Sequence, residues 1–281
     1  MFLKPKIALL LALYITSVTL VLAQGATAVN SIGMEFVLVE PGSMVVGRYE
    51  PTVAAYVPPA APAPGEPVRK VLPPSAYKVA EKMARESAKP GFEVMISRPF
   101  YIGKFEVTQA QWEKVMGGNP SFFQGGKVAG DARKHPVENV TWEEAQAFIK
   151  KLNKLDRKHI YRLPTEFEWE YAARAGAKDD IAWAEARAMG VISDTTTRPV
   201  GFKAPNAWGI YDMIGNVWEW VQDYYNEKIF ADPVPPRSGK LHVLKGASFT
   251  GDAKNATYMT HAAGPGNGFD VGFRVVMEER H

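Results

Sequence analysis

The second half of the chain combines an irregular sequence with residues that are normally buried. Residues 210–225 read IYDMIGNVWEWVQDYY, in which aromatic and acidic side chains follow neither a helix period nor a strand period. A buried loop is costly, because its backbone groups lack regular hydrogen-bond partners. Tryptophan side chains nevertheless favour the interior, and this irregular half contains Trp183, Trp208, Trp218 and Trp220. The fold must therefore satisfy a buried loop backbone, and a cation coordinated by carbonyl oxygens is one way to do so.

The chain contains no cysteine. This absence excludes disulfides, zinc–thiolate sites, a lipidated N-terminal cysteine and every thiol mechanism. The fold must depend on its hydrophobic core alone. With 281 residues, 46% of them hydrophobic, and seven tryptophans, the chain is large enough for one domain.

Residues 1–23 resemble a secretory signal peptide. Lys4 and Lys6 precede an apolar run that ends in the small-residue cleavage site Val21-Leu22-Ala23. The run is shorter than the roughly 20 residues of a membrane span. We expect a mature protein that begins near Gln24, is periplasmic or secreted, and has no stable membrane anchor after cleavage. Its small net charge indicates neither nucleic acid nor an anionic membrane as a partner.

The remaining residues, 24–281, are predicted to form a single domain with one insertion. Residues 48–92 include a stretch rich in proline and alanine, which favours an extended conformation with little to bury. This insertion is either a lid or partner-binding arm, or a tolerated surface loop.

Three helices are predicted by the same N-terminal signature. Thr108, Thr141 and Thr165 are each followed three residues later by Gln or Glu, the spacing of a capping box. Short apolar runs predict strands before and after these helices, with the first two runs paired as a hairpin. The pattern indicates an α+β fold with much irregular structure, and the strands are expected at 36–39, 44–46, 92–96, 100–102, 241–244 and 272–277.

Six motifs occur in order along the chain: GMEFVLVEPGSM (33–44), PFYIGKFEVTQAQWEKVMGGNPS (99–121), HPVENVTWEEAQAFIKKLN (135–153), YRLPTEFEWEYAARAG (161–176), NAWGIYDMIGNVWEW (206–220) and GFRV (272–275). Together these motifs resemble the sulfatase-modifying-factor family, which includes the formylglycine-generating enzymes and enzymes of ergothioneine synthesis and pyoverdine maturation. The resemblance implies the formylglycine-generating-enzyme fold, a variant C-type-lectin-like single domain with low regular secondary structure.

The resemblance also implies a structural calcium ion in the irregular segment. Its ligands would be side-chain oxygens of Asp212 and Glu219 and main-chain carbonyls of Gly215 and Val217. Calcium takes six to eight oxygen ligands, and two carboxylates neutralise its charge. In the alternative interpretation, Asp212 caps a turn and Glu219 forms an ordinary ion pair. A second calcium site of the family is expected to be lost or altered, because Asp194 is the only acid near its expected end.

The family's copper ligands are missing. By alignment, the positions of two copper-binding cysteines are Gly251 and Ala256, so no copper is expected here. The polar residues of this segment include Ser248, Asp252 and His261. A catalytic interpretation makes His261 a general base oriented by Asp252, with Ser248 positioning a substrate. In the alternative interpretation, His261 is structural and the loop lines a groove that only binds.

Two functions follow. The first is an exported, copper-independent oxidase or maturation factor that acts on a peptide-derived substrate, similar to the pyoverdine-maturation branch. The second is a non-enzymatic, lectin-like binding module for a peptide, glycan or partner protein. Fold alone does not separate them. A polar pocket converging on Ser248, Asp252 and His261 would favour catalysis, whereas an open surface would favour binding.

Overall fold

The computed structural model describes residues 26–49, 89–231, 233–253, 255–264 and 266–280, and isolated positions at 75, 78, 79 and 82. The predicted signal peptide, residues 1–23, and most of the predicted insertion, residues 48–92, lie outside the described residues. Among the described residues, no helix is long and apolar enough to cross a membrane.

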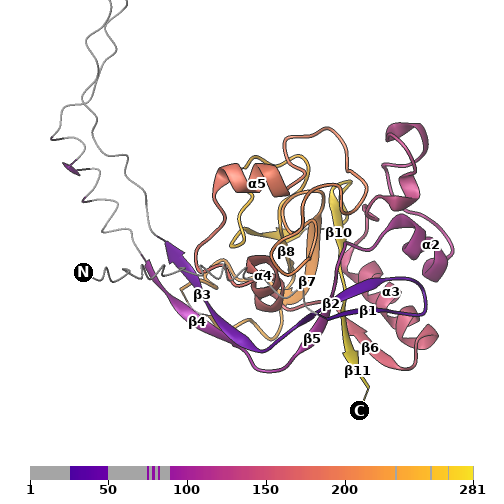
Figure 1. Ribbon diagram of the computed structural model, residues 1–281, viewed down its shortest axis with the longest axis horizontal. Helices are drawn as coiled ribbons and strands as arrows, with labels where there is room; N and C mark the ends of the chain where they lie inside the picture. Colours follow the sequence, from indigo (N-terminus) through magenta and orange to yellow (C-terminus); the bar gives the residue numbers. More distant parts are fainter. Residues whose placement is uncertain are drawn as a thin grey trace, which may run out of the picture.

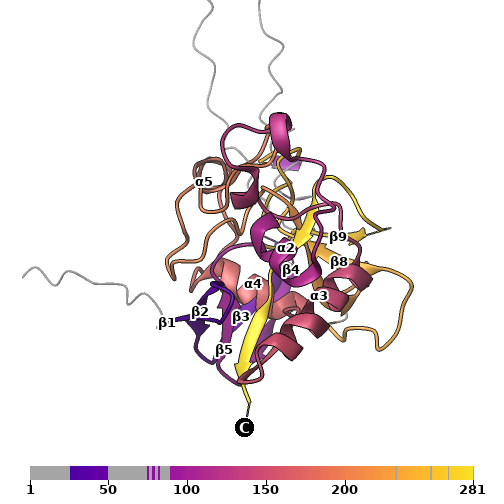
Figure 2. The same cartoon turned by 90° about the vertical axis from the view of Figure 1, so that its right-hand side faces the viewer.

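The three threonine-capped helices are confirmed. They are α2 (Gln109–Met116), α3 (Trp142–Leu155) and α4 (Glu166–Arg174), and at each the threonine hydroxyl and the Gln or Glu side chain satisfy both halves of the capping box. Helices α2 and α3 pack against each other and lie together on the side of the molecule that faces the viewer in Figure 2.

A five-stranded antiparallel sheet joins the two ends of the described chain. Its order is β1-β2-β5-β11-β6, so the last strand lies between β5 and β6. The sheet forms one wall of the core, close to helix α3 (Figure 1). The strands are β1 (Thr27–Val29), β2 (Glu35–Val39), β5 (Phe100–Gly103), β6 (His159–Arg162) and β11 (Val276–Glu279).

A second sheet contains part of the segment that we expected to be irregular. Its order is β10-β7-β8-β9, with β10 parallel to β7. The prediction was wrong for the end of 210–225, because Trp218 to Tyr224 form a central strand. The strands are β7 (Trp218–Tyr224), β8 (His242–Lys245), β9 (His261–Gly264) and β10 (Val271–Phe273).

A separate two-stranded ribbon extends from the body (Figure 1). Strand β3 (Gly42–Tyr49) pairs with β4 (Lys89–Ile96), from Gly42 opposite Ile96 to Tyr49 opposite Lys89. The predicted hairpin between residues 36–39 and 44–46 is therefore wrong, because β2 pairs instead with β1 and β5. The described ends of the predicted insertion, 48–49 and 89–92, belong to this ribbon.

Helix α4 lies near the centre of the molecule (Figure 1), and its Trp169 is fully buried in one hydrophobic cluster. Trp220 on β7 is buried in a second cluster. The sequence analysis missed one short helix, α5 (Trp183–Met189), and two short 3-10 turns, Gly125–Lys127 and Ala132–Lys134. Residues 190–217 form no helix or strand, and the prediction of a buried irregular segment holds for most of 209–217, whereas 192–208 are mostly half-buried or exposed, including Trp208.

Candidate functional site

Three carboxylates and one guanidinium are buried together where residues 210–219 meet the C-terminal motif. We call Glu106, Asp212, Glu219 and Arg274 the acidic centre. All four are at most 4% exposed. Arg274 donates from Nε and from one terminal nitrogen to the two oxygens of Glu219, at 2.7 Å each. Arg274 also donates to the main-chain oxygens of Gly103, Tyr211 and Asp212.

Glu106 and Asp212 lie in the same centre but have different partners. The Glu106 oxygens accept hydrogen bonds from the Asn216 amide at 2.6 Å and the Val217 N–H at 3.1 Å. One oxygen of Asp212 accepts the Gly201 N–H at 2.7 Å, whereas the other, Oδ1, is buried without a hydrogen-bond partner. A buried polar atom without a partner is rare and calls for a physical explanation.

The electrostatics of the centre are unbalanced. Burial, reinforced by the charges of Asp212 and Glu219, raises the pKa of Glu106 well above its usual range. Burial raises the pKa of Asp212 to about 6. Arg274 is the one cation among these four side chains, so full ionisation of the acids leaves an excess of negative charge in the interior.

These residues fit the calcium ion that the sequence resemblance implies. A divalent cation would balance the excess charge, and the unpartnered Asp212 Oδ1 is an available ligand. Among the described residues, no three acidic or histidine side chains converge closely enough to hold a metal alone. An ion here would therefore need main-chain oxygens, as predicted for Gly215 and Val217. Glu219 already accepts two bonds on Oε2, from Arg274 and the Trp169 indole, and one on Oε1 from Arg274, so it would ligate through the remaining lone pair of Oε1.

Gly215 is required by the backbone beside this centre. Its φ is 80°, a left-handed conformation that favours glycine. A Cβ at this position would lie 2.1 Å from the main-chain oxygen of Val191. Asp212 and Asn216 also have positive φ, a conformation that Asp and Asn tolerate better than most residues. The residue types at these three positions thus favour the tight turns of this segment.

At the position of the expected second calcium site, Asp194 forms an ion pair. Arg198 donates from Nε to one carboxylate oxygen of Asp194 at 2.9 Å, and the pair is partly exposed. Arg198 and the nearby backbone amide of Thr195 lower the pKa of Asp194 despite its partial burial. The guanidinium thus already supplies this carboxylate with a positive charge.

The three candidate catalytic residues have different neighbours. Ser248 is buried and donates to Asp270 at 2.8 Å. His261 lies beside Glu166, with Nδ1 and Oε1 3.1 Å apart but not aligned for a hydrogen bond. Asp252 is exposed. Glu166 is therefore an acidic neighbour of His261.

A second buried ionic group lies between α4 and β8, and sequence reasoning missed it. We call Glu166, Glu170, Arg174 and Lys245 the paired cluster. Arg174 donates to Glu170 at 2.7 Å, and Lys245 donates to the other oxygen of Glu170 at 3.2 Å. Lys245 also lies 3.9 Å from Glu166. The four-residue spacing from Glu170 to Arg174 was a visible signal for part of it.

Small residues occupy the two positions at which the sequence resemblance predicts copper ligands. Ala256 is fully buried, and Gly251 is partly exposed. The Gly251 carbonyl accepts the Ser193 N–H at 2.9 Å. Neither residue offers a side-chain ligand for copper.

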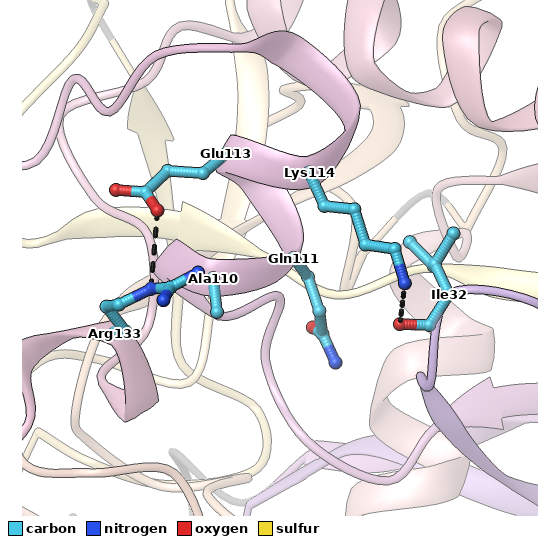
Figure 3. Close-up of a pocket in the computed structure, with 6 residues that line it drawn as sticks. All are labelled: Ile32, Ala110, Gln111, Glu113, Lys114 and Arg133. Carbon is cyan, nitrogen blue, oxygen red and sulfur yellow. Dashed lines mark hydrogen bonds and ion pairs between the residues drawn. The ribbon is translucent and has the colours of Figure 1, made fainter.

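Four surface hollows of about 280–410 Å³ lie among the described residues, and none of the four is lined by Ser248, Asp252 or His261. In the largest of the four, Arg133 pairs with Glu113 and Lys114 with the Ile32 carbonyl (Figure 3). Its charged groups thus have internal partners.

The chain is similar in sequence to a known protein family and to individual known proteins. Residues 27–279 match the family described as the sulfatase-modifying factor enzyme 1-like domain. The chain is 33% identical over 235 residues to the chaperone protein LppX of Paenibacillus barcinonensis, which covers 63% of this chain and 79% of that protein. It is 36% identical over 139 residues to the formylglycine-generating enzyme of Streptomyces coelicolor, with 41% of this chain and only 42% of the enzyme covered.

Among solved structures, PvdO from Pseudomonas aeruginosa has the same fold. The TM-score is 0.64 at 21% sequence identity, and the match covers 91% of this chain and 99% of PvdO. Together with the family match, this likeness confirms the expected α+β fold of the formylglycine-generating-enzyme type. At this level of identity it supports the fold and not a shared activity.

Proposed function

Because the chain belongs to the sulfatase-modifying factor enzyme 1-like domain family, we propose that it is an exported maturation factor that binds a polypeptide or peptide-derived partner. It works without a thiol-held copper ion. One observation carries the proposal: Gly251 and Ala256 stand where the two copper-binding cysteines are expected, in a chain without any cysteine.

Binding is favoured over catalysis by the positions of the candidate residues. A general base needs a partner that orients it and a second group within reach of the same substrate. Ser248 is bonded to Asp270, whereas His261 lies beside Glu166 on another side-chain network. This separation supports a maturation factor that holds its partner rather than a copper-independent oxidase.

The similarity to LppX supports the same proposal. That protein is named a chaperone, and the chain matches 79% of its length. The matched formylglycine-generating enzyme is covered over less than half of its length. A chaperone binds a polypeptide without transforming it, which agrees with a site that lacks the copper ligands.

Calcium forms a second part of the proposal, as a structural ion rather than a reactive one. It would be held by Asp212 and Glu219 side chains and by the Gly215 and Val217 carbonyls. The observations that support it are the unpartnered Asp212 Oδ1 and the excess of buried acids over Arg274. The ion would hold the loop backbone in place near the centre of the fold.

Export is the third part of the proposal. Lys4, Lys6 and the apolar run ending at Ala23 support a cleaved signal peptide. N-terminal sequencing of the protein from its native host should then begin near Gln24, in the periplasm or the medium. A cytoplasmic protein that begins at Met1 would contradict export.

The proposed activity is tested with the mature full-length chain and short fluorescein-labelled peptides. Equilibrium anisotropy should show saturable binding, and mass spectrometry should show no mass change after incubation with oxygen and copper. A cysteine-containing sulfatase-type peptide should likewise yield no formylglycine. Turnover above the protein-free control would overturn the binding assignment, and an absence of binding to every peptide would overturn the assignment of the partner class.

A further inference from the structure

Four phenylalanine rings from three separate loops form one cluster on the surface. Phe123 and Phe249 are buried, whereas Phe122 and Phe269 are 49% and 51% exposed. The two outer rings have centroids 6.4 Å apart, and Phe269 lies 6.2 Å from Phe123 and 6.1 Å from Phe249. Phe249 is two residues before Gly251 in the chain.

The loop that carries Phe122 is fixed by hydrogen bonds, although it has no regular secondary structure. The buried Gln109 amide donates to the Phe123 carbonyl at 3.0 Å, and buried Glu138 accepts the Phe123 N–H at 2.7 Å. Ser121 N–H donates to the Asn119 side chain at 3.0 Å. Such support lowers the conformational cost of presenting an exposed aromatic side chain to a partner.

Asn139 connects this loop to the one that carries Phe269. Its side-chain nitrogen donates to the Pro120 carbonyl at 3.0 Å, and its backbone N–H donates to the Gly268 carbonyl at 2.9 Å. Its side-chain oxygen accepts a bond from Asn267 at 2.9 Å. One residue therefore connects the two loops that carry the exposed rings.

The polar side chains beside the rings are already bonded to one another, except that one oxygen of Glu138, Oε2, has no partner and is buried. Ser248 and Thr250 donate to the same oxygen of Asp270, and Asn267 is bonded to Asn139. A glycan would need several such groups free for its hydroxyls. The charges are mixed as well, because the Lys127 ammonium lies 3.4 Å from the Phe122 ring centroid and Asp270 is acidic. This arrangement favours an uncharged, apolar group over a glycan or a strongly charged ligand.

We infer that Phe122 and Phe269 form a docking surface for an apolar side chain of an extended polypeptide partner. Large aromatic side chains that are rigidly presented at a surface are typical binding hot spots. The inference deepens the proposed function and rests on it, because it names the part of the surface that recognises the polypeptide.

The test compares peptides that differ at one position. Fluorescein-labelled Gly-Ser peptides with a central Phe, Leu or Ser are titrated with the full-length chain, and anisotropy is measured. The Phe and Leu peptides should bind about tenfold more tightly than the Ser peptide, since that ratio corresponds to about 1.4 kcal/mol, less than full burial of one such side chain. The double variant Phe122→Ser/Phe269→Ser should lose this preference.

Phe202→Ser is the matched control, because Phe202 is 58% exposed and packs near Arg198 instead. It should keep the preference. Thermal melts should show that all variants are folded. If the double variant is unfolded, the single variant Phe269→Ser replaces it in the peptide titrations.

Each other outcome is decisive. Equal binding of all peptides overturns the docking surface but leaves polypeptide binding intact, whereas no binding of any peptide overturns the proposed function as well. Displacement of the Phe peptide by chitin or mannan fragments would assign the surface to glycans instead. Displacement by a peptide of residues 51–74 would assign it to a segment of this chain, and either result would overturn the inference.

Discussion

The acidic centre and the paired cluster are both buried ionic groups, but their charges are organised differently. In the paired cluster, two carboxylates face two cations, Arg174 and Lys245, and each cation is bonded to Glu170. In the acidic centre, three carboxylates face the single cation Arg274. His261 and Asp223 adjoin the paired cluster at Glu166 and add an imidazole and a further carboxylate at its edge.

The difference shows under which conditions charged side chains can be buried. Taking ions out of water is costly, and the cost is offset only where opposite charges and hydrogen bonds are close. Although Glu166 Oε1 is buried without a hydrogen-bond partner, the paired cluster largely meets this requirement with its own side chains. The acidic centre does not, which explains the raised pKa values of Glu106 and Asp212. The centre therefore needs protons or a metal cation.

The largest expected effect comes from removing the only cation of the acidic centre. Arg274→Met should lower the free energy of unfolding by about 3–5 kcal/mol in chelator, the usual cost of leaving a buried charge without its partner. Urea unfolding measures it. Lys245→Met should cost less, because Arg174 remains beside Glu170. Saturating calcium should restore part of the stability of the Arg274 variant alone, and equal restoration of both variants would break the comparison.

A pH dependence of stability comes next. The folded-state pKa of Asp212, about 6, lies above its usual value of 3.8, so the folded state holds a proton that the unfolded state releases. Without metal, this group therefore lowers stability as the pH rises from about 4 to 6, by about 3 kcal/mol in total. Because the pKa of Glu106 is also raised, the ionisation of Glu106 should lower the stability further at higher pH.

Asp212→Asn isolates this contribution, because asparagine keeps the shape and tolerates the positive φ of 57°. In chelator, the stability of wild type relative to the Asn variant should fall across that pH range. Glu170→Gln provides the comparison from the paired cluster and should not remove the decline. A wild-type profile parallel to that of Asp212→Asn would show that Asp212 does not titrate in this window.

Calcium should stabilise the wild-type protein through the acidic centre. At a calcium concentration a hundredfold above the dissociation constant, the gain is about 2.7 kcal/mol. Glu219→Gln should lose most of it, and magnesium should substitute poorly, because it requires a tighter octahedral shell. Thermal melts with calcium and with chelator measure the effect. Glu170→Gln should retain the full calcium response, and coincident wild-type melts would contradict the calcium proposal.

The smallest effect is expected at Asp194. Its ion pair with Arg198 is partly exposed, and such pairs contribute about 0.2–1 kcal/mol. Asp194→Asn should therefore lower stability by no more than this amount and leave the calcium response unchanged. A reduced calcium response in titration calorimetry would mean that a second ion site exists here after all.

Local signals in the sequence were reliable where a few neighbouring residues decide the structure. Thr108, Thr141 and Thr165 each satisfy helix N–H groups within three residues of themselves, so the capping boxes were predictable. Strand pairing was less predictable from the sequence. Strand β7 lies at the end of a segment without a strand period, and its two neighbours in the sheet, β8 and β10, come later in the sequence.

The candidate site was predicted only in part. Asp212 and Glu219 stood out as acids among buried aromatics, and both are buried as the pattern indicated. Glu106, the third acid of the centre, lies 106 residues before Asp212 in the chain and had no local signal. The paired cluster was missed for the same reason, because Lys245 meets Glu170 only across the fold.

The sequence by itself determined the three threonine-capped helices, the absence of thiol chemistry and the family. These properties depend on residues close together in the chain or on composition alone. Tertiary structure decided which charges share the interior. Arg274 bonds to Glu219, 55 residues earlier in the chain, and His261 lies beside Glu166. Because the cost of burying a charge depends on its distance to every other charge, only the folded arrangement could set it.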